Sequence, residues 1–129
     1  MIFSIHGHPN TLATHKNTIE FTKESNLTKN GDCILGVRAD FQLDELRGIV
    51  KNFSKIKIIL KTGNLKEEII SSVNKDFNDG HEIVIRKSEY CSNRTLAIRA
   101  DKAAADIDRR LVELLKTPVT GKIEVIGIR

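Results

Sequence analysis

The amino-acid sequence predicts a β-rich α+β domain that is built from two similar halves. Residues 34–40, Ile-Leu-Gly-Val-Arg-Ala-Asp, are nearly repeated at 95–101 as Thr-Leu-Ala-Ile-Arg-Ala-Asp, with four of the seven positions identical. Short apolar alternations precede each copy, and an amphipathic stretch follows it. We therefore expect a single domain, 1–129, with internal repeats at about 1–63 and 64–129. Each repeat is expected to run strand, strand, strand, helix, strand.

The first half is expected to contain four strands and one short helix. Ile19 and Phe21 alternate with polar residues, which is typical of a half-buried strand. Leu46 and Val50 recur at helical spacing, in a helix that Gly48 weakens. The expected strands are residues 2–6, 18–23, 33–39 and 56–60, and the expected helix is 42–53.

The second half repeats this order with one ambiguous element. The spacing of the apolar residues in 68–73 also fits a helix, but the β-branched residues there and the repeat favour a strand. A stripe of apolar residues predicts a helix over 102–116, which Pro118 ends. The expected strands are residues 68–73, 82–87, 95–100 and 122–128.

The two halves are expected to pack together rather than to form separate domains, because neither can bury its sheet face alone. A pseudo-twofold barrel or sandwich with two helices satisfies this constraint. In either architecture, Arg38 should superpose on Arg99 and Asp40 on Asp101, because these pairs occupy equivalent positions of the repeated motif.

The composition is that of an ordinary globular domain with a mild basic excess. Charged residues make up 29% and hydrophobic residues 40%, and the formal net charge of +4 favours anionic partners without identifying one. With no Trp and one Tyr, aromatic platforms for stacking bases are scarce. The residues after Met1 resemble neither a signal peptide nor a membrane span. We therefore expect a cytoplasmic protein with no membrane partner, in which Cys33 and Cys91 are free thiols.

Three histidines near the N-terminus are candidates for a zinc site or for proton transfer. His6 and His8 share one face of a strand, and His15 follows after a short loop. Three imidazoles can hold Zn²⁺ with one position open for water, and Glu20 or Asp32 could act as the base. Without a metal, His8 and His15 could transfer protons while Asp32 orients one of them. The plain alternative is that these histidines are polar surface or loop residues.

Cys33 follows a Gly-Asp turn and also has two interpretations. A thiolate at this position could act as a nucleophile. However, the neighbouring carboxylate of Asp32 would raise the pKa of the thiol, so a small buried side chain is favoured.

Cationic residues near the second helix predict an anion-binding site. Asp40 and Asp101 both precede an expected helix, and the simple interpretation is that each caps it. A helix N-terminus also binds phosphate or carboxylate, because its N–H groups and its dipole attract anions. We therefore expect a small anionic ligand at the second helix, bound by Arg94, Arg99, Asp101 and Lys102, unless a neighbouring carboxylate pairs with Arg99.

Several short motifs, spread over nearly the whole chain, together resemble one protein family. They are His8-Pro9-Asn10, Ala13-Thr14-His15, Glu20-Phe21-Thr22, Gly31-Asp32-Cys33, and Arg94-Thr95-Leu96 followed by Arg99-Ala100-Asp101-Lys102-Ala103-Ala104. This set is similar to the pattern of domain-of-unknown-function family 371, which comprises small, mainly archaeal proteins with no assigned activity. The resemblance implies a cytosolic, archaeal protein and supplies no catalytic residues. One departure is Phe41, where the family pattern has lysine, so an anion site built on that lysine survives only at Lys102.

Two functional hypotheses of different classes follow, and whether the protein is an enzyme stays open between them. In the first, the protein holds a small anionic ligand at the second helix and uses histidines for acid/base chemistry. In the alternative, the protein is an RNA- or DNA-binding module that uses its basic surface. The scarce aromatic residues and the lack of a recognisable nucleic-acid motif count against the alternative. A structural or assembly role is a third possibility.

Overall fold

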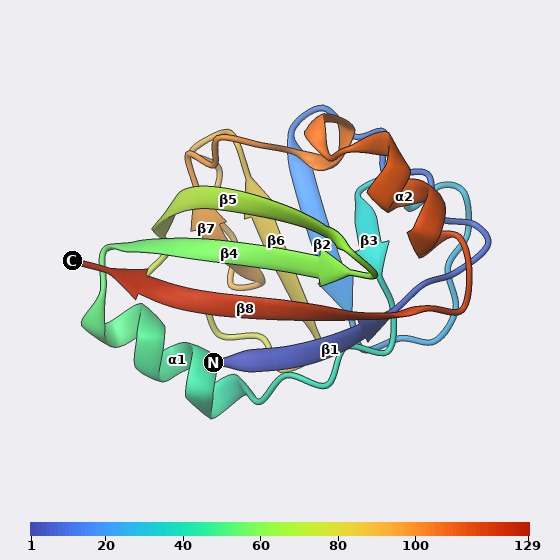
Figure 1. Cartoon of the computed structure of the whole chain (residues 1–129). Helices are drawn as coiled ribbons and strands as arrows, with labels where there is room; N and C mark the ends of the chain where they lie inside the picture. The colour runs from blue at the N-terminus through green and yellow to red at the C-terminus, as the bar shows by residue number, and fades with distance from the viewer.

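The computed structural model describes all 129 residues and contains one mixed sheet of eight strands with two helices (Figure 1). The predicted α+β class and the predicted order of strands and helices are confirmed, and residues 68–73 lie in a strand. The strands are β1 (Ile2–His6), β2 (Thr18–Thr22), β3 (Ile34–Gly36), β4 (Lys55–Thr62), β5 (Leu65–Val73), β6 (Glu82–Arg86), β7 (Thr95–Ile98) and β8 (Thr120–Ile128). The helices are α1 (Leu43–Asn52) and α2 (Arg109–Leu115), with a 3₁₀ turn at Ala104–Asp106.

The two edges of this sheet meet each other. The strand order is β1-β8-β4-β5-β7-β6-β2-β3, with parallel pairing in β2–β3 and β6–β7 and antiparallel pairing elsewhere. The N–H of His6 donates to the carbonyl of Val37 at 2.8 Å, and the N–H of Val37 donates back at 2.9 Å. Because His6 ends β1 and Val37 follows β3, these bonds close the sheet into a barrel and leave no long exposed edge. Two packed sheets, the sandwich alternative, are not observed.

The interior of the barrel is filled by aromatic and aliphatic side chains. Phe3 on β1 makes edge-to-face contacts with Phe21 and Phe41, with ring centroids 6.1 and 5.6 Å apart, and all three rings are buried. Burying a side chain of this size contributes roughly 1.5–3 kcal/mol. α1 adds Leu46 and Val50, which helical spacing places on one face. In Figure 1, α1 lies beside β8 and α2 lies at the other end of the barrel.

The two copies of the Arg-Ala-Asp motif adopt the same local geometry. Arg38 and Arg99 both have a φ of 51°, in the left-handed region that non-glycine residues rarely enter. The carboxylate of Asp40 accepts a hydrogen bond from the N–H of Ser4 at 2.6 Å, and the N–H of Asp40 donates to the Ser4 carbonyl at 3.2 Å. Asp101 makes the same pair of bonds with a residue of β5, each at 3.0 Å. Each motif therefore ties its turn to a neighbouring strand.

These aspartates do not cap the helices, so that part of the prediction is wrong. The cap of α2 is Asp108, whose carboxylate accepts a hydrogen bond from the N–H of Arg110 at 2.9 Å. Gln42 precedes α1 and makes no side-chain capping bond. Because Asp40 and Asp101 satisfy N–H groups of β1 and β5, their carboxylates serve the sheet rather than the helices.

The helix expected over 102–116 begins seven residues later than predicted, at Arg109. A longer helix would need the N–H of Ala105 to donate to the carbonyl four residues earlier. That N–H donates instead to the carbonyl of His15 at 3.0 Å, and the guanidinium of Arg109 donates to the carbonyl of Ala104 at 2.7 Å. These competing partners thus override the helix propensity of the alanines.

Replacing Gly7 with Ala should destabilise the protein. An added Cβ would lie 2.0 Å from the carbonyl oxygen of Thr117 and 2.6 Å from that of Leu115. Both atoms are backbone, so relief requires the chain after α2 to move away from the end of β1, and overpacking of this kind costs about 1–3 kcal/mol. Urea unfolding measures the loss. Gly80→Ala is the control, since its Cβ would meet Leu43 only at an ordinary 3.7 Å, and equal losses in both variants would contradict the steric explanation.

Candidate functional site

The arginines predicted to hold an anion are paired with carboxylates. The Nη1 of Arg94 lies 3.1 Å from a carboxylate oxygen of Glu82 and 3.5 Å from one of Glu20. The Nε of Arg99 lies 2.7 Å from a carboxylate oxygen of Glu89. A guanidinium that is neutralised in this way has less charge to offer to a ligand.

The remaining residues of that predicted site are also committed to the fold. The ammonium of Lys102 lies 3.0 Å from the carboxylate of Glu67 and donates to the carbonyl of Glu68 at 2.8 Å. Asp101 accepts the N–H of Ile70, and the N-terminus of α2 is at Arg109, not beside Lys102. None of the four predicted residues lines a cavity of the structure. The four residues are therefore engaged with groups of the protein itself, and the start of α2 lies away from Lys102.

The three histidines are not gathered around one point. His6 and His8 line the same pocket, whereas His15 does not line it. No group of three or more His, Cys, Asp or Glu residues in the structure could hold a metal ion. The carboxylate of Asp32 makes no hydrogen bond to either predicted catalytic ring, and its backbone carbonyl instead accepts the N–H of His15 at 3.2 Å. The structure therefore does not bring the three predicted zinc ligands together.

Backbone hydrogen bonds fix the tautomers of two of these histidines. The Nδ1 of His8 accepts the N–H of Asn10 at 3.0 Å. The Nδ1 of His15 accepts two, from Asn17 at 3.1 Å and Thr18 at 3.0 Å. An imidazole that accepts at Nδ1 carries its proton on Nε2 when it is neutral. Each ring can therefore donate a hydrogen bond from Nε2. A metal bound at Nε2 would leave the proton on Nδ1, and the ring would then lose the hydrogen bond that Nδ1 accepts from the backbone.

The pocket that contains His6 and His8 has a volume of about 220 Å³ and lies where the barrel closes. The N–H of Gly7 donates to Val119 at 2.9 Å, and the N–H of His8 donates to Leu115 at 2.8 Å. These bonds anchor the segment after β1 against the chain that leaves α2. The pocket is lined by His6, Gly7, His8, Pro9, Ser25, Val37, Arg38 and Pro118. We call it the histidine pocket.

Arg38 supplies the positive charge of the histidine pocket. Its left-handed backbone is held by the hydrogen bond from its N–H to the carbonyl of Glu24 at 2.8 Å. Its side chain is exposed and makes neither an ion pair nor a hydrogen bond, whereas the equivalent Arg99 is paired with Glu89. The sequence motif contained Arg38, but only its surroundings in the fold distinguish it from Arg99.

A second cluster, formed by Glu20, Glu82, Arg94 and Cys33, lies on neighbouring strands. The antiparallel register of β2 and β6 places Glu82 opposite Thr22, two residues from Glu20 along the same face. Burial raises the pKa of Glu20 to about 7, and a hydrogen bond and charge repulsion from Glu82 add to the rise, while Arg94 opposes it. The sequence analysis did not single out Glu82, because it lies far from Glu20 along the chain. Only the pairing of β2 with β6 brings the two residues close together.

Cys33 belongs to this cluster as a protonated thiol. Its Sγ lies 3.8 Å from a carboxylate oxygen of Glu20. Burial, followed by the charges of Glu20 and Asp32, raises the pKa of the thiol to about 12. At neutral pH it is therefore not a thiolate nucleophile, in agreement with the favoured interpretation of the sequence.

Glu20 should make the stability of the protein depend on pH between about 4.5 and 7. The folded protein holds the Glu20 proton up to about pH 7, whereas an unfolded chain releases it near 4.5. The folded state thus binds more protons in this window, so stability falls as pH rises through it, by about 2–3 kcal/mol. Urea unfolding at pH 5 and pH 8 measures this slope.

Glu20→Gln is the matching variant, since the amide keeps the shape and can donate to Glu82 but does not titrate. The decline between pH 5 and pH 8 should be smaller in this variant than in the wild type. An identical pH slope in both proteins would show that Glu20 does not carry the effect.

No helix of the structure has the length and apolar character needed to cross a membrane.

Comparison with known proteins identifies the family of the chain. The family model described as "Domain of unknown function (DUF371)" matches residues 3–127. A protein of Methanocaldococcus jannaschii, described as uncharacterized, is 41% identical over 121 residues, which cover 89% of this chain and 90% of that protein. The family model spans both halves of the barrel, the histidine pocket and the Glu20 cluster. The chain therefore belongs to the DUF371 domain family.

Proposed function

We propose that the protein binds a small anionic ligand, bearing a phosphate or carboxylate group, in the histidine pocket. The observation that carries this proposal is the unpaired guanidinium of Arg38 at the wall of the pocket. Arginine presents a planar set of donors that matches a carboxylate or phosphate. The cations first expected to do this, Arg94, Arg99 and Lys102, are occupied by carboxylates.

The other polar groups of the histidine pocket are compatible with an anion. Neutral His8 carries its proton on Nε2, because Nδ1 accepts from Asn10. It can therefore act as a hydrogen-bond donor, as can the hydroxyl of Ser25. No Asp or Glu lines this pocket. A volume of about 220 Å³ suits a ligand of a few non-hydrogen atoms rather than a nucleotide.

Acid/base chemistry by His6 and His8 is part of the same proposal. Both rings line the pocket that would hold the ligand, and histidine is the side chain best suited to exchange protons near neutral pH. His15 and Asp32 are no longer included, because neither lines the pocket. Binding alone, without a reaction, is compatible with the same residues.

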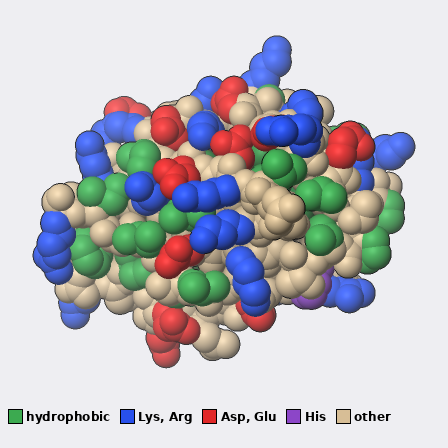
Figure 2. Space-filling view, in the orientation of Figure 1, with side chains coloured by type: hydrophobic (Ala, Val, Ile, Leu, Met, Phe, Trp, Pro, Cys, Tyr) green, Lys and Arg blue, Asp and Glu red, His purple; other side chains and the backbone are tan.

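The alternative proposal, a nucleic-acid-binding module, has weaker support. The face shown in Figure 2 carries many lysines and arginines, but aspartates and glutamates lie among them. Such mixing does not produce the basic stripe that tracks a phosphate backbone. Salt dependence distinguishes the two proposals, because a protein that contacts many phosphates loses affinity steeply as the salt concentration rises.

We also propose that the barrel arose by internal duplication. The two halves present the same order of elements, and the Arg38 and Arg99 turns have the same backbone conformation. The histidine pocket is the feature that breaks this similarity, since it forms at only one of the two turns.

Arg38→Gln should weaken phosphate binding by about 10- to 100-fold, because hydrogen bonds to a charged group contribute roughly 1.5–3 kcal/mol. Calorimetric titration with inorganic phosphate at low salt measures this. Arg99→Gln is the matched control, since it changes the equivalent turn but removes an arginine that already pairs with Glu89. Equal affinities of wild type and Arg38→Gln, or no phosphate binding by the wild type, would remove the proposal.

A further inference from the structure

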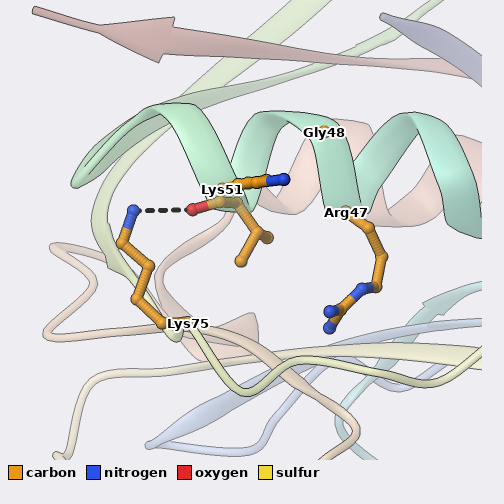
Figure 3. A pocket seen from close by; sticks show the side chains of 5 residues that line it. Arg47, Gly48, Lys51 and Lys75 are labelled. Carbon is orange, nitrogen blue, oxygen red and sulfur yellow. Dashed lines mark hydrogen bonds between the residues drawn. The ribbon is translucent and has the colours of Figure 1, made fainter.

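A second cavity, which shares no residue with the histidine pocket, lies against one face of α1. Its volume is about 520 Å³, and it is lined by Arg47, Gly48, Val50, Lys51 and Lys75. Figure 3 shows Arg47 and Lys51 projecting from α1, with Lys75 reaching toward the helix from the segment after β5. Three of its five lining residues are cations and none is a carboxylate. We call it the α1 pocket.

The cations of the α1 pocket are held in place without being neutralised by carboxylates. Lys75 donates to the carbonyls of Val50 and Phe53, each at 2.7 Å, and the first of these bonds is the dashed line in Figure 3. Arg47 donates to the carbonyl of Phe77. Carbonyls carry only partial negative charge, and those at the end of α1 are already bound by Lys75. A positive excess therefore remains in the α1 pocket.

Lys51 is the cation of the α1 pocket without a partner. Its side chain makes neither an ion pair nor a hydrogen bond, and it is exposed. Arg47 precedes it by four residues, so two like charges lie on the same side of the helix. Such a pair destabilises an isolated helix, and an anion bound near both charges would offset the repulsion.

The packing of the protein does not explain why glycine occupies position 48. Glycine inside a helix is less stable than alanine, and one use of glycine is to let another group approach the backbone closely. A Cβ at Gly48 would meet no protein atom within 4 Å, so no neighbouring part of the fold requires its absence. The open space above Gly48 is the α1 pocket. A ligand that lies in the pocket would explain the glycine.

We propose that the α1 pocket binds a small phosphate-bearing molecule with at least two negative charges. Three cations suit a ligand with several charges, and the bare backbone at Gly48 allows it to approach the helix. Like-charged neighbours and a helical glycine are unfavourable for folding alone, and such local conflicts concentrate at functional sites. This site is separate from the histidine pocket, with which it shares no residue.

Inorganic pyrophosphate is the probe, and citrate is the comparison anion that carries negative charge without phosphorus. Amide chemical shifts during each titration should move first at Gly48, Lys51 and Lys75, with pyrophosphate binding at least tenfold more tightly than citrate. Shift changes that map elsewhere, or equal binding of both anions, would overturn the proposal.

Two variants separate a ligand site from a structural feature. Lys51→Glu should weaken pyrophosphate binding at least tenfold without unfolding the protein, because Lys51 has no partner to lose. Gly48→Ala should also weaken binding, yet raise the melting temperature by about 4 °C, because alanine favours the helix. Improved stability with unchanged binding would show that the α1 pocket is not the site.

The controls are one charge reversal outside both pockets and one variant of the histidine pocket. Lys29→Glu changes an exposed lysine by the same charge, and it should leave pyrophosphate binding within twofold of the wild type. Arg38→Gln should leave the shifts at Gly48 unchanged, which keeps this proposal distinct from the one for the histidine pocket. A comparable loss in Lys29→Glu would indicate attraction by net charge alone and would contradict a defined site.

Discussion

Two hydrogen bonds between His6 and Val37 join the edges of the sheet, and much of the molecule depends on that closure. They bring the end of β1 beside the turn that contains Arg38. The turn is further tied by the carboxylate of Asp40, which accepts the N–H of Ser4 on β1. The equivalent turn in the second half is tied to β5 in the same way. Closure therefore buries the core and also creates the histidine pocket at the junction.

The placement of carboxylates decides which cations are available to ligands. Arg94, Arg99 and Lys102 each lie within 3.1 Å of a glutamate oxygen, so their charge is compensated inside the protein. Arg38 and Lys51 lack such partners, and each lines a cavity without carboxylates. The two proposed anion sites thus follow from one electrostatic criterion, applied to two separate cavities. On the face shown in Figure 2, acidic side chains lie among the lysines and arginines.

Buried polar groups add a different kind of constraint. Glu20 is a buried carboxyl on β2, and the loss of hydration that follows from burial raises its pKa to about 7. Proximity to Glu82 adds to this effect, and Arg94 limits it. The cluster couples three strands and keeps the thiol of Cys33 protonated. No member of the cluster lines a cavity of the structure, so the cluster is separate from both proposed sites.

Apolar periodicity and local motifs are enough to predict the class, the order of elements, most strand positions and the family. The sequence also singled out His6 and His8, and the motif that contains Arg38. Only the tertiary structure decided the start of α2, since Arg109 and the carbonyl of His15 compete for the backbone of the predicted helix. It likewise decided which arginine of the repeated motif is paired. Ion pairs and cavities join residues that are far apart in the chain, and the local patterns that define strands and helices carry no information about such partners.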